Sequence, residues 1–119
     1  MQDTAAPTLF PLFLDLRGRR VLVVGGGSVA ARKVTALLEA QADVALVAPA
    51  LDATLAPLVR MQRITHLGAT FARHQLDDAW LVIATTDDPL VNRVVAEAAN
   101  TRRLWVNVVD DAELATFPC

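Results

Sequence analysis

Short runs of branched aliphatic residues recur along the chain and predict buried strands. Within each run the apolar residues are nearly continuous instead of alternating with polar ones, which is typical of strands covered on both faces of a parallel sheet. Four runs are strong: Arg20–Val24, Val44–Ala48, Trp80–Ala84 and Trp105–Val109. A fifth run, Ile64–Leu67, is weaker and is expected at an edge of the sheet.

Segments of helical period separate these runs. Three sets of apolar residues each fit one face of a helix: Ala30, Val34, Leu37 and Leu38; Leu51, Leu55, Leu58 and Val59; and Val91, Val94, Val95 and Ala98. Thr54 is expected to cap the second helix, which puts Pro57 in the first turn, where its missing N–H costs no helical hydrogen bond. Asp88 is expected to cap the third helix, with Pro89 in the first helical position.

This alternation of strands and helices predicts the fold class. The order is βαβαβ, a connection and a final βαβ, which favours an α/β fold with a doubly wound (Rossmann) five-stranded parallel sheet and right-handed crossovers. The expected strand order is 3-2-1-4-5, with Ile64–Leu67 at one edge and Trp105–Val109 at the other. A length of 119 residues suits a single domain, residues 1–119.

Composition and net charge limit the kinds of molecule that the protein is expected to bind. The chain is 54% hydrophobic, and its net charge of −2 gives no overall attraction to nucleic acid or to an anionic membrane. Its single cysteine, Cys119, excludes a disulfide framework, and no apolar run is long enough to span a membrane. We therefore expect a cytoplasmic protein with neither nucleic acid nor a membrane as a partner.

A glycine-rich stretch, VLVVGGGSVAARK, follows the first predicted strand and opens the first predicted helix. Gly25, Gly27 and Ala30 form the pattern G-x-G-x-x-A. In the dinucleotide-binding form of this turn the first small residue permits a tight bend, the second admits the pyrophosphate, and the third lets helix and strand pack closely. The helix N-terminus then attracts the phosphates. The stretch predicts dinucleotide binding.

The choice between NAD and NADP stays open at this point. A carboxylate that binds the adenosine ribose usually ends the second strand, about 20 residues downstream of the glycines. Here the strand ends Val47–Ala48–Pro49–Ala50, and no acid follows until Asp52. No Arg or Lys lies beside it to favour a 2′-phosphate either.

Polar residues follow the fourth predicted strand, at Thr85, Thr86 and Asp87. Ligands in open parallel sheets bind beyond the carboxyl ends of the strands, so these residues are expected at the same crevice as the glycines. For Asp87 and Asp88, a role as a polar cap between strand and helix explains the pattern as well as a role at the crevice does.

A third cluster, Asn107–Val108–Val109–Asp110–Asp111, stands where the fifth strand leaves the sheet. A carboxylate there can take a proton or meet a metal ion, although a turn aspartate explains the bare pattern as well. His66 and His74 lack nearby Asp, Glu or Cys at ligand spacing, so they are expected to be surface or strand residues. No metal-binding residue is predicted.

Taken together, LFLDLRGRRVLVVGGGSVAARK, VAPAL, LVIATTDDPLVN and NVVDDAELATF resemble one family. It is precorrin-2 dehydrogenase/sirohydrochlorin ferrochelatase, the N-terminal part of sirohaem synthase. The resemblance implies NAD-dependent oxidation of precorrin-2, a tetrapyrrole, to sirohydrochlorin, followed by insertion of ferrous iron as a second substrate. It also implies a homodimer for the full-length protein.

The resemblance further implies roles for individual residues. Asp110 matches the aspartate that the family assigns to catalysis, where a carboxylate would act as the base. The resemblance also implies nine cofactor-binding residues, which match the family's pyrophosphate turn, the stretch beside its adenosine ribose and its nicotinamide side. They are Gly25, Gly26, Gly27, Ser28, Val29, Pro49, Ala50, Thr85 and Thr86.

Family members continue beyond this motif into a dimerisation and substrate-covering region. Residues 1–119 are therefore expected to be the dinucleotide-binding domain of a longer protein, with cofactor binding better supported than turnover. Two alternatives remain open: a regulatory domain that senses a nicotinamide dinucleotide without catalysis, and a dehydrogenase of a different small substrate.

Overall fold

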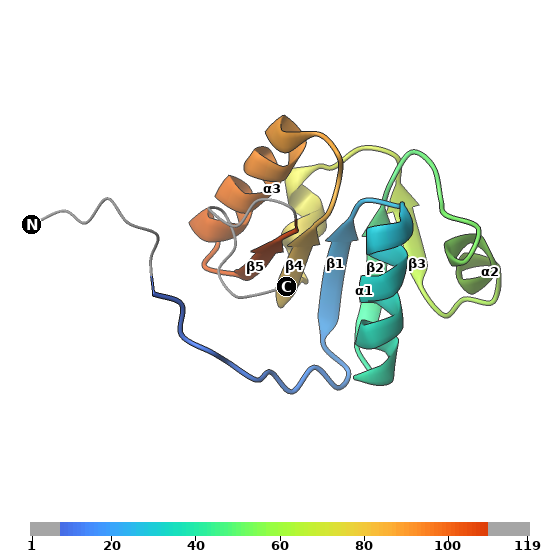
Figure 1. Cartoon of the computed structure of the whole chain (residues 1–119), viewed down its shortest axis with the longest axis horizontal. Coiled ribbons are helices and arrows are strands. Elements are labelled where there is room, and N and C mark those ends of the chain that lie inside the picture. Colours follow the sequence, from blue (N-terminus) through green and yellow to red (C-terminus); the bar gives the residue numbers. More distant parts are fainter. Residues whose placement is uncertain (1–7, 110–119) are drawn as a thin grey trace, which may run out of the picture.

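A twisted parallel sheet forms the centre of the molecule in the computed structural model, which describes residues 8–109 (Figure 1). All strand pairs are parallel, and the strand order is β3-β2-β1-β4-β5. The predicted fold class and order are confirmed. The strands are β1 (Arg20–Val24), β2 (Asp43–Val47), β3 (Thr65–Gly68), β4 (Leu81–Ala84) and β5 (Trp105–Val108).

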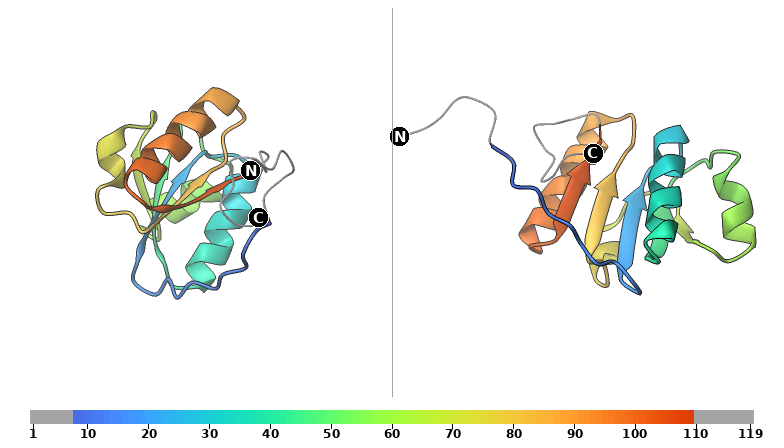
Figure 2. Two further views of the ribbon diagram at one scale, coloured as in Figure 1. Left: turned by 90° about the vertical axis from the view of Figure 1, so that its left-hand side faces the viewer. Right: turned by 60° about the horizontal axis from the view of Figure 1, so that its bottom comes forward.

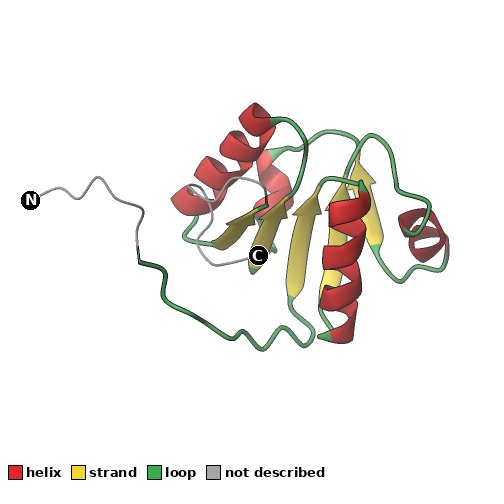
Figure 3. Cartoon of the chain, viewed as in Figure 1, coloured by secondary structure: helices red, strands yellow, loops and turns green. Residues whose placement is uncertain are grey.

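Helices cover both faces of the sheet. They are α1 (Ser28–Glu39), α2 (Leu55–Arg60) and α3 (Pro89–Thr101), with a short 3₁₀ helix η1 (Arg73–Leu76) before β4. The left view of Figure 2 shows α1 and α3 on opposite sides of the strands, and Figure 3 shows the same layers by element type. This arrangement follows from crossovers of one hand on either side of the central strand β1.

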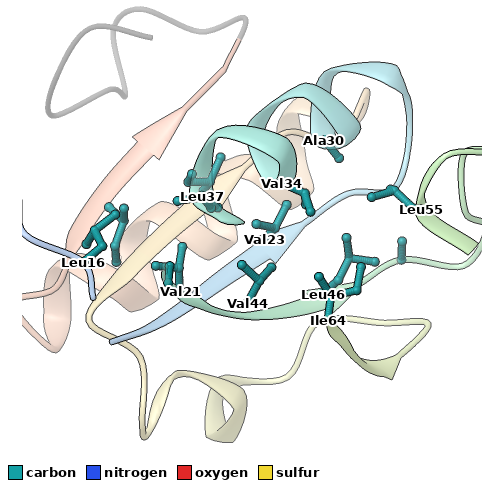
Figure 4. Close-up of a cluster of buried hydrophobic side chains, with 14 of the residues drawn as sticks. Leu16, Val21, Val23, Ala30, Val34, Leu37, Val44, Leu46, Leu55 and Ile64 are labelled. Atoms are coloured by element: carbon teal, nitrogen blue, oxygen red, sulfur yellow. The ribbon is translucent and has the colours of Figure 1, made fainter. Parts of the chain in front are cut away.

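Alternate residues of the three central strands β2, β1 and β4 enter two separate apolar cores because successive side chains point to opposite faces. In β1, Val21 and Val23 join the core under α1 and α2, whereas Leu22 and Val24 join the core under α3 and η1. Figure 4 shows the first core, where Val34 of α1 packs over the strands. Full burial on both faces explains the nearly continuous apolar runs.

The observed element bounds lie close to the predicted ones. β1 agrees, and the other strands differ by a single residue at one or both ends. Asp88 caps α3 as predicted, since its Oδ1 accepts a hydrogen bond of 2.9 Å from the Leu90 N–H. Thr54 stands in the predicted cap position of α2, but its side chain makes no capping bond and donates to Asp52 instead.

The predicted apolar stripe of α3 is wrong at one position. Val94 is 46% exposed, whereas Asn92 is 4% exposed and faces the sheet side. Asn92 can be buried because Thr86 satisfies its amide, as described below. The buried residues of α3 are Asn92, Val95, Ala96, Ala98 and Ala99, which leaves Val94 outside the buried face.

Residues 8–19 precede β1 without helix or strand, and Leu14 and Leu16 of this segment pack against the first core. In Figure 1 the segment runs along the lower side of the sheet. Among the described residues no helix has the length and apolar character needed to cross a membrane.

Truncation of Leu46 tests the role of this double-sided core. Leu46 of β2 is fully buried, so Leu46→Ala should lower the free energy of unfolding by about 2–5 kcal/mol through lost transfer energy and a cavity. Leu90→Ala is the matched control, because Leu90 is 72% exposed and should change stability by less than about 0.5 kcal/mol. Urea denaturation measures both, and equal effects would contradict the assigned core.

Candidate functional site

A cavity of about 680 Å³ opens at the carboxyl ends of the strands. It lies over the boundary between β1 and β4, where the connections turn to opposite faces of the sheet, the usual ligand position in open α/β folds. All nine residues predicted to bind a cofactor line it. Four segments supply most of its wall: residues 25–29, 49–52, 69–71 and 85–88.

Two of the three consecutive glycines are required by the packing of the protein itself. Gly25 has a φ of +134°, and a Cβ there would lie 2.8 Å from both the Cγ2 and the carbonyl oxygen of Thr85. A Cβ on Gly26 would lie 2.7 Å from the Cβ of Ala48 and would also collide with the Ala50 carbonyl. Side chains at either position would separate the ends of β1, β2 and β4.

Gly27 is different, because nothing lies within 4 Å of the position a Cβ would take. Its φ of −89° is accessible to any residue, so neither backbone strain nor internal packing explains a glycine here. The empty space belongs to the cavity that Gly27 lines. The missing side chain therefore makes room for a ligand against the backbone.

The N-terminus of α1 gives this space a positive electrostatic character. Gly27 is the N-cap, no side chain caps the helix, and the first turn contains no acidic residue. The Ala31 N–H donates to the carbonyl of the N-cap Gly27 at 3.0 Å, so the N–H groups that precede it in the first turn have no acceptor within the helix. Together with the helix dipole, these donors favour an anionic group such as a pyrophosphate.

Thr85 lines the cavity and carries a buried, unpaired hydroxyl. The residue is 9% exposed, and its Oγ1 is the one buried side-chain polar atom among the described residues without a hydrogen-bond partner. Leaving such a group unsatisfied costs about 1–3 kcal/mol, so native proteins rarely tolerate one without a reason. A ligand in the cavity would supply the missing partner.

Thr86 is held in place by Asn92 from the first turn of α3. The Thr86 hydroxyl donates to the Asn92 Oδ1 at 2.7 Å, and the Thr86 N–H donates to the same oxygen at 3.1 Å. The Asn92 Nδ2 donates back to the Thr86 carbonyl at 2.9 Å. Sequence reasoning missed Asn92, although a polar residue inside an apolar helical stripe was a usable signal.

Within residues 8–109, the ionisable residues that line the cavity are Asp52, Asp87 and Asp88. Among the described residues, no Lys, Arg or His side chain joins them there. Asp52 accepts hydrogen bonds at Oδ2 from the Thr54 N–H (3.0 Å) and hydroxyl (2.6 Å), which hold the pKa of its carboxyl below its usual range. Sequence reasoning did not select Asp52 as a site residue.

Two other residues singled out in the sequence, His66 and His74, do not line the cavity. Asp110 and Asp111 fall outside the described residues. His66 of β3 hydrogen-bonds through Nε2 to the Ala48 carbonyl at 2.9 Å, and His74 belongs to η1. Within residues 8–109 no group of three His, Cys, Asp or Glu side chains could hold a metal ion.

These features agree in the ligand they fit. Gly27 with its open space, the first residues of α1 and Thr85 with its orphaned hydroxyl all line one cavity. A nicotinamide dinucleotide carries a central pyrophosphate between two riboses. The pyrophosphate is an anion that suits the space at Gly27 and the N–H donors of α1. The ribose hydroxyl groups suit the Thr85 hydroxyl.

Several known proteins are similar to this chain in sequence or in fold. Residues 12–119 match the family model described as "Putative NAD(P)-binding". The chain is 52% identical to the siroheme synthase of Methylobacillus flagellatus and 50% identical to siroheme synthase 1 of Serratia proteamaculans, each over 107 residues. Each match covers 90% of this chain, but only 23% and 22% of the two relatives.

A solved structure, that of SirC, precorrin-2 dehydrogenase, superposes with a TM-score of 0.76 at 29% identity. The match covers 87% of this chain and 50% of that one. The resemblance indicated by the motifs is therefore confirmed, and the chain spans at most half the length of the proteins it matches.

Filling the open space at Gly27 tests the ligand cradle. Gly27→Val should leave the fold intact, because nothing lies within 4 Å of the new Cβ, but should abolish measurable dinucleotide binding by occupying the space above the backbone. Gly68→Val is the control, since Gly68 is equally open and does not line the cavity. Isothermal titration calorimetry measures both, and unchanged NAD affinity in Gly27→Val would refute the cradle.

The orphaned hydroxyl gives a second test. Thr85→Val preserves shape, so the protein without ligand should be as stable as the wild type or more so, while dinucleotide affinity falls by roughly tenfold. Thr35→Val, on the exposed face of α1, removes a hydroxyl that already bonds to the Ala31 carbonyl and serves as the control. Lower stability with unchanged affinity in Thr85→Val would show that the hydroxyl has a partner within the protein.

Proposed function

The chain belongs to the NAD(P)-binding family, and from this premise we propose that it carries the cofactor-binding part of an NAD-dependent precorrin-2 dehydrogenase. The full-length enzyme would oxidise precorrin-2 to sirohydrochlorin in sirohaem biosynthesis. The similar proteins, siroheme synthases and SirC, support this assignment. The observation that carries it is the cavity at the strand ends, where the space at Gly27 adjoins the uncapped start of α1.

Residues of this chain would bind the dinucleotide along the cavity wall. The N–H groups at the start of α1 would bind the pyrophosphate, with Gly27 allowing the approach. Pro49 and Ala50 would contact the adenosine side, on the segment that follows β2, and Thr85 would donate its free hydroxyl. Thr86, oriented by Asn92, would support the nicotinamide side. Bound NAD supplies the hydride acceptor for the oxidation.

Asp110 is the proposed catalytic base. Oxidation of precorrin-2 transfers a hydride to the nicotinamide and releases a proton, which requires an acceptor group. The backbone that leads to Asp110 supports this role, because the Val109 N–H donates to the Ala84 carbonyl at 2.9 Å. The chain is therefore still paired with the end of β4 at Val109, the residue before Asp110. Its partner there, Ala84, is the residue before Thr85, which lines the cavity.

The remaining parts of the proposal concern the whole protein. We propose that residues 1–119 are its dinucleotide-binding domain and that a dimerisation and substrate region lies in the part of the relatives that the match does not cover. The full-length protein would then be a cytoplasmic homodimer that takes precorrin-2 as its tetrapyrrole substrate and inserts ferrous iron into the product.

Replacement of the proposed base tests the function. In the full-length protein, Asp110→Asn should leave NAD binding near normal and lower precorrin-2 oxidation by roughly 10²–10⁴-fold, the contribution of a positioned acid–base group. Asp111→Asn is the control and should have a much smaller effect. Absorbance of NADH with precorrin-2 as substrate gives the rates.

Two outcomes would contradict the proposal in different ways. Turnover of Asp110→Asn within a few-fold of wild type, or a larger loss in Asp111→Asn, would overturn the assignment of the base. NAD binding by the wild type without any oxidation of precorrin-2 would instead favour a regulatory domain that senses the dinucleotide.

A further inference from the structure

We propose that the Asp52 carboxylate selects NAD over NADP by accepting a hydrogen bond from the 2′-hydroxyl of the adenosine ribose and repelling a 2′-phosphate. This inference rests on the proposed cofactor cavity and deepens it, because it assigns a specificity-determining residue that the sequence pattern did not reveal. Four features of the structure support it: the path of the chain after β2, the bonding of the carboxylate, the charge of the cavity and the position of the other two aspartates.

The segment after β2 folds back onto the glycine turn. Ala48 and Ala50 lie so close to Gly26 that no side chain fits there, and the Asp52 N–H donates to the Gly26 carbonyl at 2.6 Å. Asp52 follows the end of β2 by more residues than the ribose-binding acid of a usual dinucleotide fold. The fold-back offsets this extra length and returns Asp52 to the wall of the cavity.

The bonding of the Asp52 side chain leaves one oxygen for a ligand. Oδ2 accepts from the N–H and the hydroxyl of Thr54, and among the described residues Oδ1 has no hydrogen-bond partner. An ionised carboxylate can only accept hydrogen bonds, so Oδ1 suits a ribose hydroxyl. An aspartate is ionised at neutral pH, and the two donations from Thr54 lower the pKa of this carboxyl further.

The charges around the cavity disfavour a second phosphate on the ribose. A phosphate monoester carries a charge of about −1.5 to −2 at neutral pH and is normally bound by Arg or Lys. The ionisable side chains that line the cavity, within the described part of the chain, are all aspartates. A 2′-phosphate would therefore meet like charge, with no compensating cation among the described residues of the lining.

The other two aspartates are less suited to this role. The Asp88 Oδ1 accepts from the Leu90 N–H as the cap of α3, and Asp87 follows β4. In dinucleotide folds the adenosine ribose lies beside the end of the second strand. Among the three acids, Asp52 is the one that follows β2.

Binding measurements on the full-length protein test the inference without turnover. Calorimetry with NAD and NADP should give a wild-type preference for NAD of roughly tenfold or more, the value of one charge-assisted hydrogen bond. AMP and adenosine 2′,5′-bisphosphate probe the adenosine end alone and should show the same preference for the ligand without the 2′-phosphate. Asp52→Asn keeps the acceptor for Thr54 but removes the charge, so it should reduce the NAD preference by roughly tenfold.

Asp87→Asn is the matched control, because it removes the same charge from the same cavity beside β4, and it should leave the preference within about twofold of wild type. Equal binding of AMP and the bisphosphate by the wild type would overturn the inference even if the variant did not fold. So would an unchanged preference in Asp52→Asn, or an equal shift in Asp87→Asn.

The results also separate this inference from the proposed function. If the wild type binds neither NAD nor NADP, both fail together. If Asp52→Asn changes the dinucleotide preference as expected but the wild-type protein does not oxidise precorrin-2, the proposed enzyme activity fails and the role of Asp52 stands.

Discussion

The close approach of three backbone segments at Gly25 and Gly26 is the constraint on which the site depends. The end of β1 touches Thr85 after β4 on one side and the segment after β2 on the other, at distances that leave no room for a Cβ. This contact brings the polar ends of both halves of the sheet to one cavity. It also leaves Gly27, next in sequence, as the glycine whose free space serves a ligand instead of the fold.

Much of this architecture could be predicted from local patterns. Strands buried on both faces show as continuous apolar runs, and the cap and proline at Asp88 and Pro89 are signals within one turn of helix. The glycine spacing indicated a dinucleotide site because each small residue of the pattern has its own role: a tight bend, space for the pyrophosphate, or close packing of helix and strand. It could not show that Gly26 is also required, since that requirement comes from Ala48 and Ala50.

The features that sequence reasoning missed depend on contacts between distant segments. Asn92 interrupts an apolar stripe, and its burial makes sense only when Thr86 satisfies its amide. The buried face of α3 includes Asn92 and leaves Val94 exposed, although periodicity alone assigned Val94 to the core. Asp52 was too far along the chain to fit a fixed spacing, and only its bond to Gly26 brings it back to the cavity.

The division of the apolar residues into two cores has a consequence for synthesis of the chain. The face of β1 formed by Leu22 and Val24 is covered by η1 and α3, which come after β3 in sequence. While a ribosome has released only the residues up to β3, this face of three paired strands has no helix to cover it. Such exposed apolar surface and open strand edges favour aggregation. We therefore expect the nascent chain to be most prone to aggregation before α3 emerges and packs onto the sheet.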